Sequence, residues 1–163
     1  MIAVAPVTRA QLPELLRLLQ AKADFDGARA NLRANLGNLG DELFSANPRV
    51  KAILAMRDGE VVGMATYHAI FSSFLVRPGI WLDDLYVDLA HRKAGVGEAL
   101  LSSLCGEALT NGCARIDWIV NASNDNGLGF YTRMGARVFT SGRLARLDEG
   151  AIRALAASRL ASR

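Results

Sequence analysis

The stretch Arg92-Lys93-Ala94-Gly95-Val96-Gly97 lies between two segments of different periodicity and decides the fold class. Before it, residues 80–87 form an apolar run that is interrupted by two adjacent aspartates, which is typical of a strand with a bulge. After it, apolar residues recur at helical spacing over residues 96–109. The stretch is therefore predicted to be the loop of a strand–loop–helix unit.

This loop has the composition of an anion site. Its two glycines, spaced by one residue, let backbone amides converge on one point, and a helix N-terminus adds unpaired N–H groups. Arg92 and Lys93 add cationic donors. The same glycine spacing also serves as a plain close-packing turn, so the loop alone leaves both interpretations open. No Gly-Lys-Ser/Thr follows, which excludes a P-loop, and no third glycine with a downstream acidic partner supports a dinucleotide-binding fold.

Upstream of this unit the sequence predicts a strand and two helices. Residues 2–7 read as a strand, and Thr8 as the N-cap of an amphipathic helix. The apolar positions of that helix are Leu12, Leu15, Leu16 and Leu19. A second helix is predicted over 26–44, with a bend or break at its two glycines, Gly37 and Gly40, and an end before Asn47-Pro48.

The Asp58-Gly59 turn between apolar runs 50–56 and 60–71 predicts an antiparallel hairpin. Further downstream the pattern predicts a strand over 115–120, a helix over 125–134, a strand over 136–140 and a final helix from about residue 148. Hairpins at one end and strand–helix–strand units at the other predict an α/β (α+β) protein, a mixed sheet covered by helices. We expect a single domain over residues 1–163.

Composition and charge exclude several classes of function. Apolar residues make up 51% and charged residues 21% of the chain, as in soluble globular proteins. No leader-like N-terminus and no long apolar window is present, so we expect a cytoplasmic protein without a membrane role. The net charge of +3 is scattered, which argues against a nucleic-acid partner, and the two cysteines lack neighbours at metal-ligand spacing, so no metal is expected.

Two motifs resemble those of the GNAT family of N-acetyltransferases. Arg92-x-x-Gly95-x-Gly97, after a strand ending Tyr86-Val87, is similar to the family signature Gln/Arg-x-x-Gly-x-Gly/Ala. Asn124-Asp125-Asn126-Gly127-Leu128-Gly129-Phe130-Tyr131, followed by Gly135-Ala136, resembles the second family motif. Leu82-Asp83-Asp84-Leu85-Tyr86-Val87 is similar to the Leu-Glu-Asp-Leu-Phe-Val run of diamine (spermidine/spermine) acetyltransferases, and the likeness covers most of residues 1–140.

The resemblance implies the GNAT fold, a single, mostly antiparallel mixed sheet flanked by helices, and acetyl-CoA as cofactor. Backbone amides of the bulged strand, at Leu85 and Val87, would polarise the acetyl carbonyl and hold the pantetheine. The implied cofactor-binding residues are Leu85, Tyr86, Val87, Arg92, Lys93, Ala94, Gly95, Val96, Gly97, Glu98, Asn124 and Tyr131.

The resemblance also implies the catalytic groups. Tyr131 would protonate the CoA sulfur, and Asp83 would deprotonate the amine through water, although Asp84 could take that task instead. Asp24 and Asp26, together with the aspartate pair, could attract a cationic acceptor, but the first two also read as solvated helix caps.

Three functions are compatible with these features. The leading one is acetylation of a primary amine of a small molecule (a polyamine, a diamine or an amino-acid-like compound) by direct attack, in a homodimer. Acetylation of a protein N-terminus or lysine is a second, and a non-catalytic CoA-binding module is a third.

Overall fold

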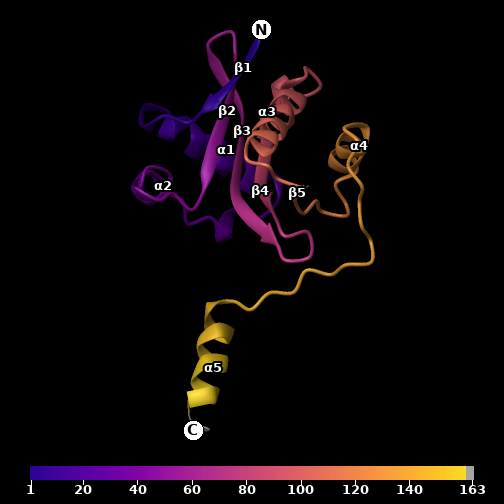
Figure 1. The fold of residues 1–163 in the computed structure, drawn as a ribbon. Coiled ribbons are helices and arrows are strands. Elements are labelled where there is room, and N and C mark those ends of the chain that lie inside the picture. The colour runs from indigo at the N-terminus through magenta and orange to yellow at the C-terminus, as the bar shows by residue number, and fades with distance from the viewer. Residues whose placement is uncertain (161–163) are drawn as a thin grey trace. The chain divides into compact units, whose positions relative to one another are not determined.

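The computed structural model describes residues 1–160, and it divides the chain into two compact units, residues 1–120 and residues 121–163 (Figure 1). The first unit holds a five-stranded sheet in the order β1-β2-β3-β4-β5. Neighbouring strands are antiparallel except β4 and β5, which are parallel. The strands are β1 Ile2–Pro6, β2 Lys51–Arg57, β3 Glu60–Ser72, β4 Arg77–Val87 and β5 Ile116–Asp117. The α-helices are α1 Leu12–Phe25, α2 Leu36–Leu43 and α3 Val96–Thr110, with 3-10 turns at Arg9–Gln11, Arg29–Asn31 and Leu89–His91.

Helices α1 and α3 cover opposite faces of this sheet. Met64 of β3 is fully buried in a cluster with Leu15 and Leu18 of α1. Its neighbour Gly63 faces α3 instead, and successive residues of a strand point to opposite faces. The predicted α/β (α+β) fold with one mixed sheet flanked by helices is therefore confirmed. Among the α1 leucines, Leu18 is fully buried and Leu16 is only half-buried, so the buried stripe differs by one position from the predicted one.

The prediction of one helix over 26–44 was wrong in its first half. Residues 29–31 form a 3-10 turn, Leu32 is extended, and α2 begins only after Asn35. The side chain of Asn35 accepts a hydrogen bond from the Asn38 amide (3.0 Å), and the Asn38 side chain caps the Asn35 amide in return. This reciprocal cap starts a new helix, and both glycines lie inside it rather than breaking it.

The central hairpin and the bulge are confirmed. Asp58 and Gly59 both adopt positive φ (52° and 86°), as a two-residue hairpin turn requires. In β4, Asp84 pairs with Thr66 and Leu82 pairs with Tyr67, so Asp83 is the extra residue of a β-bulge.

Strand β5 is much shorter than the predicted 115–120. It pairs with β4 only at Ile80↔Ile116 and Trp81↔Asp117, so beyond Trp81 no described strand covers this edge of β4.

The second unit contains helices α4 (Asp125–Arg133) and α5 (Glu149–Leu160), close to the predicted ones. The prediction of a strand over 136–140 was wrong: these residues form none, because an apolar alternating run becomes a strand only where a neighbouring strand accepts its hydrogen bonds. Asp148 accepts from the Ala151 amide (2.9 Å) and so begins α5.

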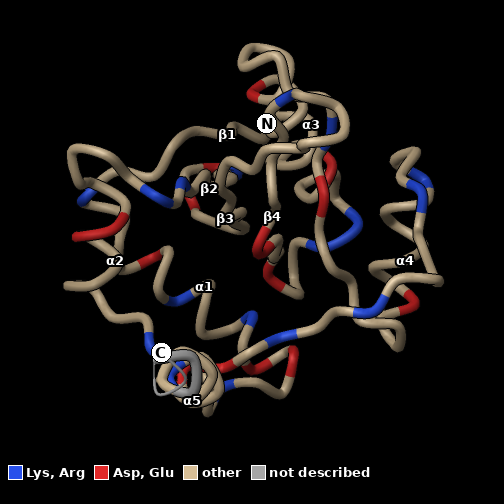
Figure 2. Tube along the Cα trace, turned by 60° about the horizontal axis from the view of Figure 1, so that its bottom comes forward, with Lys and Arg blue, Asp and Glu red and all other residues tan. Residues whose placement is uncertain are grey.

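Charged residues of both signs are interspersed along the helices and loops (Figure 2). Within residues 1–160, no helix is long and apolar enough to cross a bilayer.

Candidate functional site

The bulge reverses the direction of the β4 amides along the strand. The Ile80 amide donates to Arg115 O on the β5 side (3.0 Å), whereas the Asp88 amide donates to Val62 O on the β3 side (2.9 Å). In a regular strand these two amides, eight residues apart, would point the same way, because the direction alternates with every residue. The extra residue Asp83 lies between them and shifts the alternation by one.

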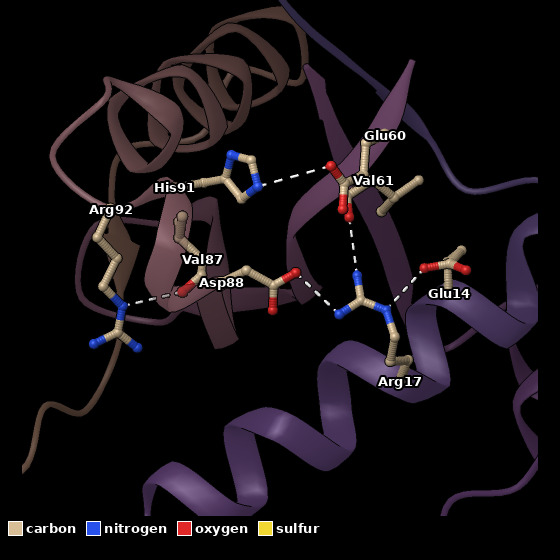
Figure 3. Close-up of polar contacts among 8 residues, drawn as sticks. All are labelled: Glu14, Arg17, Glu60, Val61, Val87, Asp88, His91 and Arg92. Atoms are coloured by element: carbon tan, nitrogen blue, oxygen red, sulfur yellow. Dashed lines mark hydrogen bonds and ion pairs between the residues drawn. The ribbon is translucent and has the colours of Figure 1, made fainter. Parts of the chain in front are cut away.

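This reversal places two amides on the open edge of β4. Since Asp88 hydrogen-bonds toward β3, the peptide groups of Leu85 and Val87 point away from β3, toward the edge that β5 leaves uncovered. The Val87 carbonyl accepts from Nε of Arg92 at 3.0 Å, which agrees with that direction (Figure 3). The two residues whose amides the sequence singled out thus point toward the edge along which no described strand pairs with β4.

The predicted anion loop leads directly into α3. Gly95 has φ of +84° and is the N-cap, a left-handed conformation that suits glycine. The first helical bond runs from the Ala99 amide to Gly95 O (2.9 Å), and no side chain caps this end. The first helical amides, which have no acceptor within the helix, are those of Val96, Gly97 and Glu98. Lys93, two residues before Gly95, also has positive φ (62°).

The Arg92 side chain is held in place from two sides. Its Nε donates to Val87 O, and its guanidinium carbon lies 4.5 Å from the ring centre of Phe25 and 5.5 Å from that of Tyr86. In Figure 3 its two terminal nitrogens point away from the strand. Fixing the guanidinium while leaving its terminal N–H groups outward is a suitable arrangement for binding a phosphate.

A second arginine, Arg17 of α1, fastens the helix to the end of β4. Its guanidinium contacts Asp88 (2.9 Å), Glu14 (2.9 Å) and the carbonyl of Val61 (2.9 Å), as Figure 3 shows. Sequence reasoning missed this residue, because two of its three partners, Val61 and Asp88, are 44 and 71 residues away along the chain.

Close approach of α3 to the sheet depends on Gly63. A Cβ at this position would lie 3.0 Å from Tyr86 O, 3.1 Å from Val96 Cγ1 and 3.3 Å from Leu100 Cδ1. We expect Gly63→Ala to lower the free energy of unfolding by about 1–3 kcal/mol, because the backbone oxygen cannot move away easily. Urea denaturation measures this. Gly106 lies on α3, where a Cβ would point into open space, so Gly106→Ala should instead stabilise the protein by about 0.5–1 kcal/mol. Equal effects of the two substitutions would contradict the packing argument.

Both aspartates of the bulge project from the same face of the sheet. Asp83 accepts from Trp81 Nε1 (3.1 Å) and lies 3.4 Å from His68 Nδ1, while Asp84 accepts from the Thr66 hydroxyl (3.2 Å). Thr66 and His68 are two residues apart on β3 and so share a face. Burial raises the pKa of Asp84, and Lys22 together with the Thr66 hydroxyl opposes that rise.

A small pocket of about 200 Å³ lies beside Asp84. It is lined by Leu19, Lys22, Ala23, Asp26, Ala28, Asn31, Leu32 and Asp84. Lys22 lies between the two carboxylates: its ammonium pairs with Asp26 and lies 3.6 Å from Asp84. Asp24 is exposed and pairs with Arg29 (2.7 Å) outside this lining. The structure thus brings Asp26 and Asp84 together and leaves Asp24 and Asp83 outside.

The remaining predicted residues, Asn124 and Tyr131, belong to the second unit. Asn124 is the N-cap of α4, and its side chain accepts from the Gly127 amide (2.9 Å). The Tyr131 ring contacts that of Phe130 with 5.0 Å between centres. Burial raises the pKa of Tyr131 to about 12, so the phenol is protonated at neutral pH.

Comparisons with known proteins agree with these features. A family model described as "Acetyltransferase (GNAT) family" matches residues 13–136. L-ornithine N5-acetyltransferase NATA1 of Arabidopsis thaliana is 34% identical over 100 residues, 61% of this chain and 44% of that protein. The chain thus spans less than half of this relative.

Two further matches cover more of both chains. Thialysine N-epsilon-acetyltransferase of Sus scrofa is 26% identical over 134 residues, 77% of this chain and 78% of the relative. The solved structure of an integron cassette protein from the mobile metagenome of V. cholerae has a TM-score of 0.76 at 24% identity, over 95% of this chain and 97% of its own. At that identity the likeness shows the fold.

Proposed function

This chain belongs to the acetyltransferase (GNAT) family, and we propose that it transfers an acetyl group from acetyl-CoA to a primary amine of a small molecule. One observation carries the proposal. The bulge at Asp83 turns the Leu85 amide to the open edge of β4, and the residue beside it, Asp84, lines the pocket that also holds Asp26. An acyl donor bound along the edge and an amine bound in the pocket would therefore lie beside two neighbouring residues of β4, Leu85 and Asp84.

The residues present fit acetyl-CoA. Open amides at Leu85 and Val87 suit an extended pantetheine, and the uncapped start of α3 suits a pyrophosphate. We assign the pyrophosphate to the α3 amides, with Arg92 and Lys93 as cationic donors. The wider set of contacts, Tyr86, Ala94, Gly95, Glu98 and Asn124, is proposed from the family motifs. When bound, acetyl-CoA supplies the acetyl group as a thioester whose sulfur leaves as a thiolate.

Each remaining step has a residue suited to it. The Leu85 amide would donate to the acetyl oxygen as negative charge develops there. Asp84 would bind the acceptor ammonium and act as the general base that passes its proton to water. Asp83, beside His68, is the other candidate for that task. Tyr131, protonated at neutral pH, would give a proton to the departing sulfur. In this scheme residues 1–163 are one acetyltransferase domain.

The pocket favours a small acceptor over a protein. A volume of about 200 Å³ accommodates a short amine chain, and its two carboxylates suit ammonium groups. The relatives named for ornithine and thialysine also act on small amines. A cytoplasmic homodimer is the assembly and location that the family resemblance suggests.

The direct test is thiol release from acetyl-CoA by the purified chain. We expect free CoA to appear when putrescine, spermidine, ornithine or lysine is added singly, and little without amine. A peptide with a free N-terminus serves as the protein-like acceptor. Faster release with the peptide would favour a protein acetyltransferase. Calorimetric CoA binding with no release across the panel would indicate a binding module instead.

A further inference from the structure

The acceptor pocket contains a cation of its own. The Lys22 side chain is 22% exposed, and its ammonium lies against Asp26 and 3.6 Å from Asp84. With both carboxylates and the amine ionised, the three groups together carry one negative charge. An ammonium between the two acids weakens the attraction of this pocket for polyamines, because like charges repel at this distance.

The charge of Lys22 separates two classes of acceptor that share the same reacting amine. A diamine brings two ammonium groups and must place at least one of them close to Lys22. A diamino acid brings the same two ammonium groups and a carboxylate, for a net charge of one positive unit, which balances the pocket. Lys22 can pair with that carboxylate, while Asp26 and Asp84 receive the ammonium groups.

On the basis of the function proposed above, we propose that the acceptor is a diamino acid and that Lys22 binds its α-carboxylate. The side-chain amine then lies at Asp84, beside the Leu85 amide, and the α-amino group lies toward Asp26 at the end of α1. Asn31 lines the same pocket and can donate its side-chain amide to the carboxylate. Lys22 is in this view a specificity residue and takes no part in the chemical step.

Acceptors that differ only in the carboxylate test this without any change to the protein. L-ornithine, L-ornithinamide and putrescine keep the reacting amine and the chain, and the last two lack the negative charge. We expect kcat/KM to be at least roughly tenfold higher for ornithine than for either, the range that one charge-assisted hydrogen bond supplies. Equal or better use of putrescine overturns this inference and leaves the proposed function standing. Silence with all three, and with the wider amine panel, overturns both.

Variants of Lys22 test the residue itself. Lys22→Met keeps the length of the side chain and removes the charge, so kcat/KM for ornithine should fall roughly tenfold or more while that for putrescine is unchanged or rises. Lys22→Arg should restore most of the preference. Lys51→Met is the matched control, because Lys51 pairs with Glu107 (2.6 Å) and does not line the pocket. An unchanged ornithine-to-putrescine ratio in folded Lys22→Met, checked by circular dichroism, contradicts the assignment.

Discussion

Replacing Tyr131 by phenylalanine is expected to lower kcat by roughly two to four orders of magnitude, the range for loss of a general acid. The phenol is protonated at neutral pH because burial raises its pKa to about 12, and phenylalanine offers no proton to the departing sulfur. The substitution keeps the ring that contacts Phe130, so α4 should stay intact. Steady-state thiol release gives kcat, and calorimetry gives the affinity for CoA, which should change by no more than a few fold.

Tyr67 provides the control for this experiment. It is a second buried tyrosine, on β3, and burial raises its pKa to about 12 as well. Tyr67→Phe should leave kcat nearly unchanged, since no step is assigned to it. Turnover that survives in Tyr131→Phe would show that another group, or water, protonates the sulfur. Loss of CoA affinity in that variant would indicate a binding role instead.

The sequence predicted the elements around the anion loop because each depends on local chemistry. The Asp58-Gly59 turn, the glycine at the start of α3 and the aspartate pair of the bulge carry their own signals. The direction of the Leu85 and Val87 amides, by contrast, does not depend on local chemistry alone. It follows from the bulge only when the hydrogen bonds to β3 and β5 are known, and these join residues far apart in the sequence.

The predictions that were wrong or incomplete also depend on contacts between residues far apart in the sequence. Within the described residues, 136–140 form no strand, and of 115–120 only Ile116 and Asp117 pair with β4. Asp24 and Asp26 look equivalent in the sequence, yet one pairs with Arg29 at the surface and the other lines the pocket. Lys22 was missed entirely. Its spacing of four residues from Asp26 signals a helical ion pair, but only the packing of α1 against β4 places it beside Asp84.

The second large effect is expected from Asp84→Asn, which should lower kcat/KM for the amine by roughly two orders of magnitude or more. The amide keeps the shape of the side chain and its contact with Thr66, but it can neither accept the amine proton nor attract an ammonium group. Asp83→Asn distinguishes the two candidates for this task. A larger loss there than in Asp84→Asn would assign the base to Asp83 and His68. Asp24→Asn, outside the pocket, should have little effect.

Asp84→Asn should raise the stability of the protein near pH 7 while it lowers the activity. Burial raises the pKa of Asp84, so the folded protein binds this proton more tightly than the unfolded chain does. The contribution of Asp84 to stability is therefore greatest below its unfolded pKa and is lost as the pH rises through its folded pKa.

An asparagine avoids burying the charge, so Asp84→Asn should melt higher than the wild type near pH 7. The difference should vanish in acid, where Asp84 is protonated in both states, and melting curves across that pH range would reveal it. A lower melting temperature at pH 7 would mean that the pairing of Asp84 with Lys22 outweighs the cost of burial.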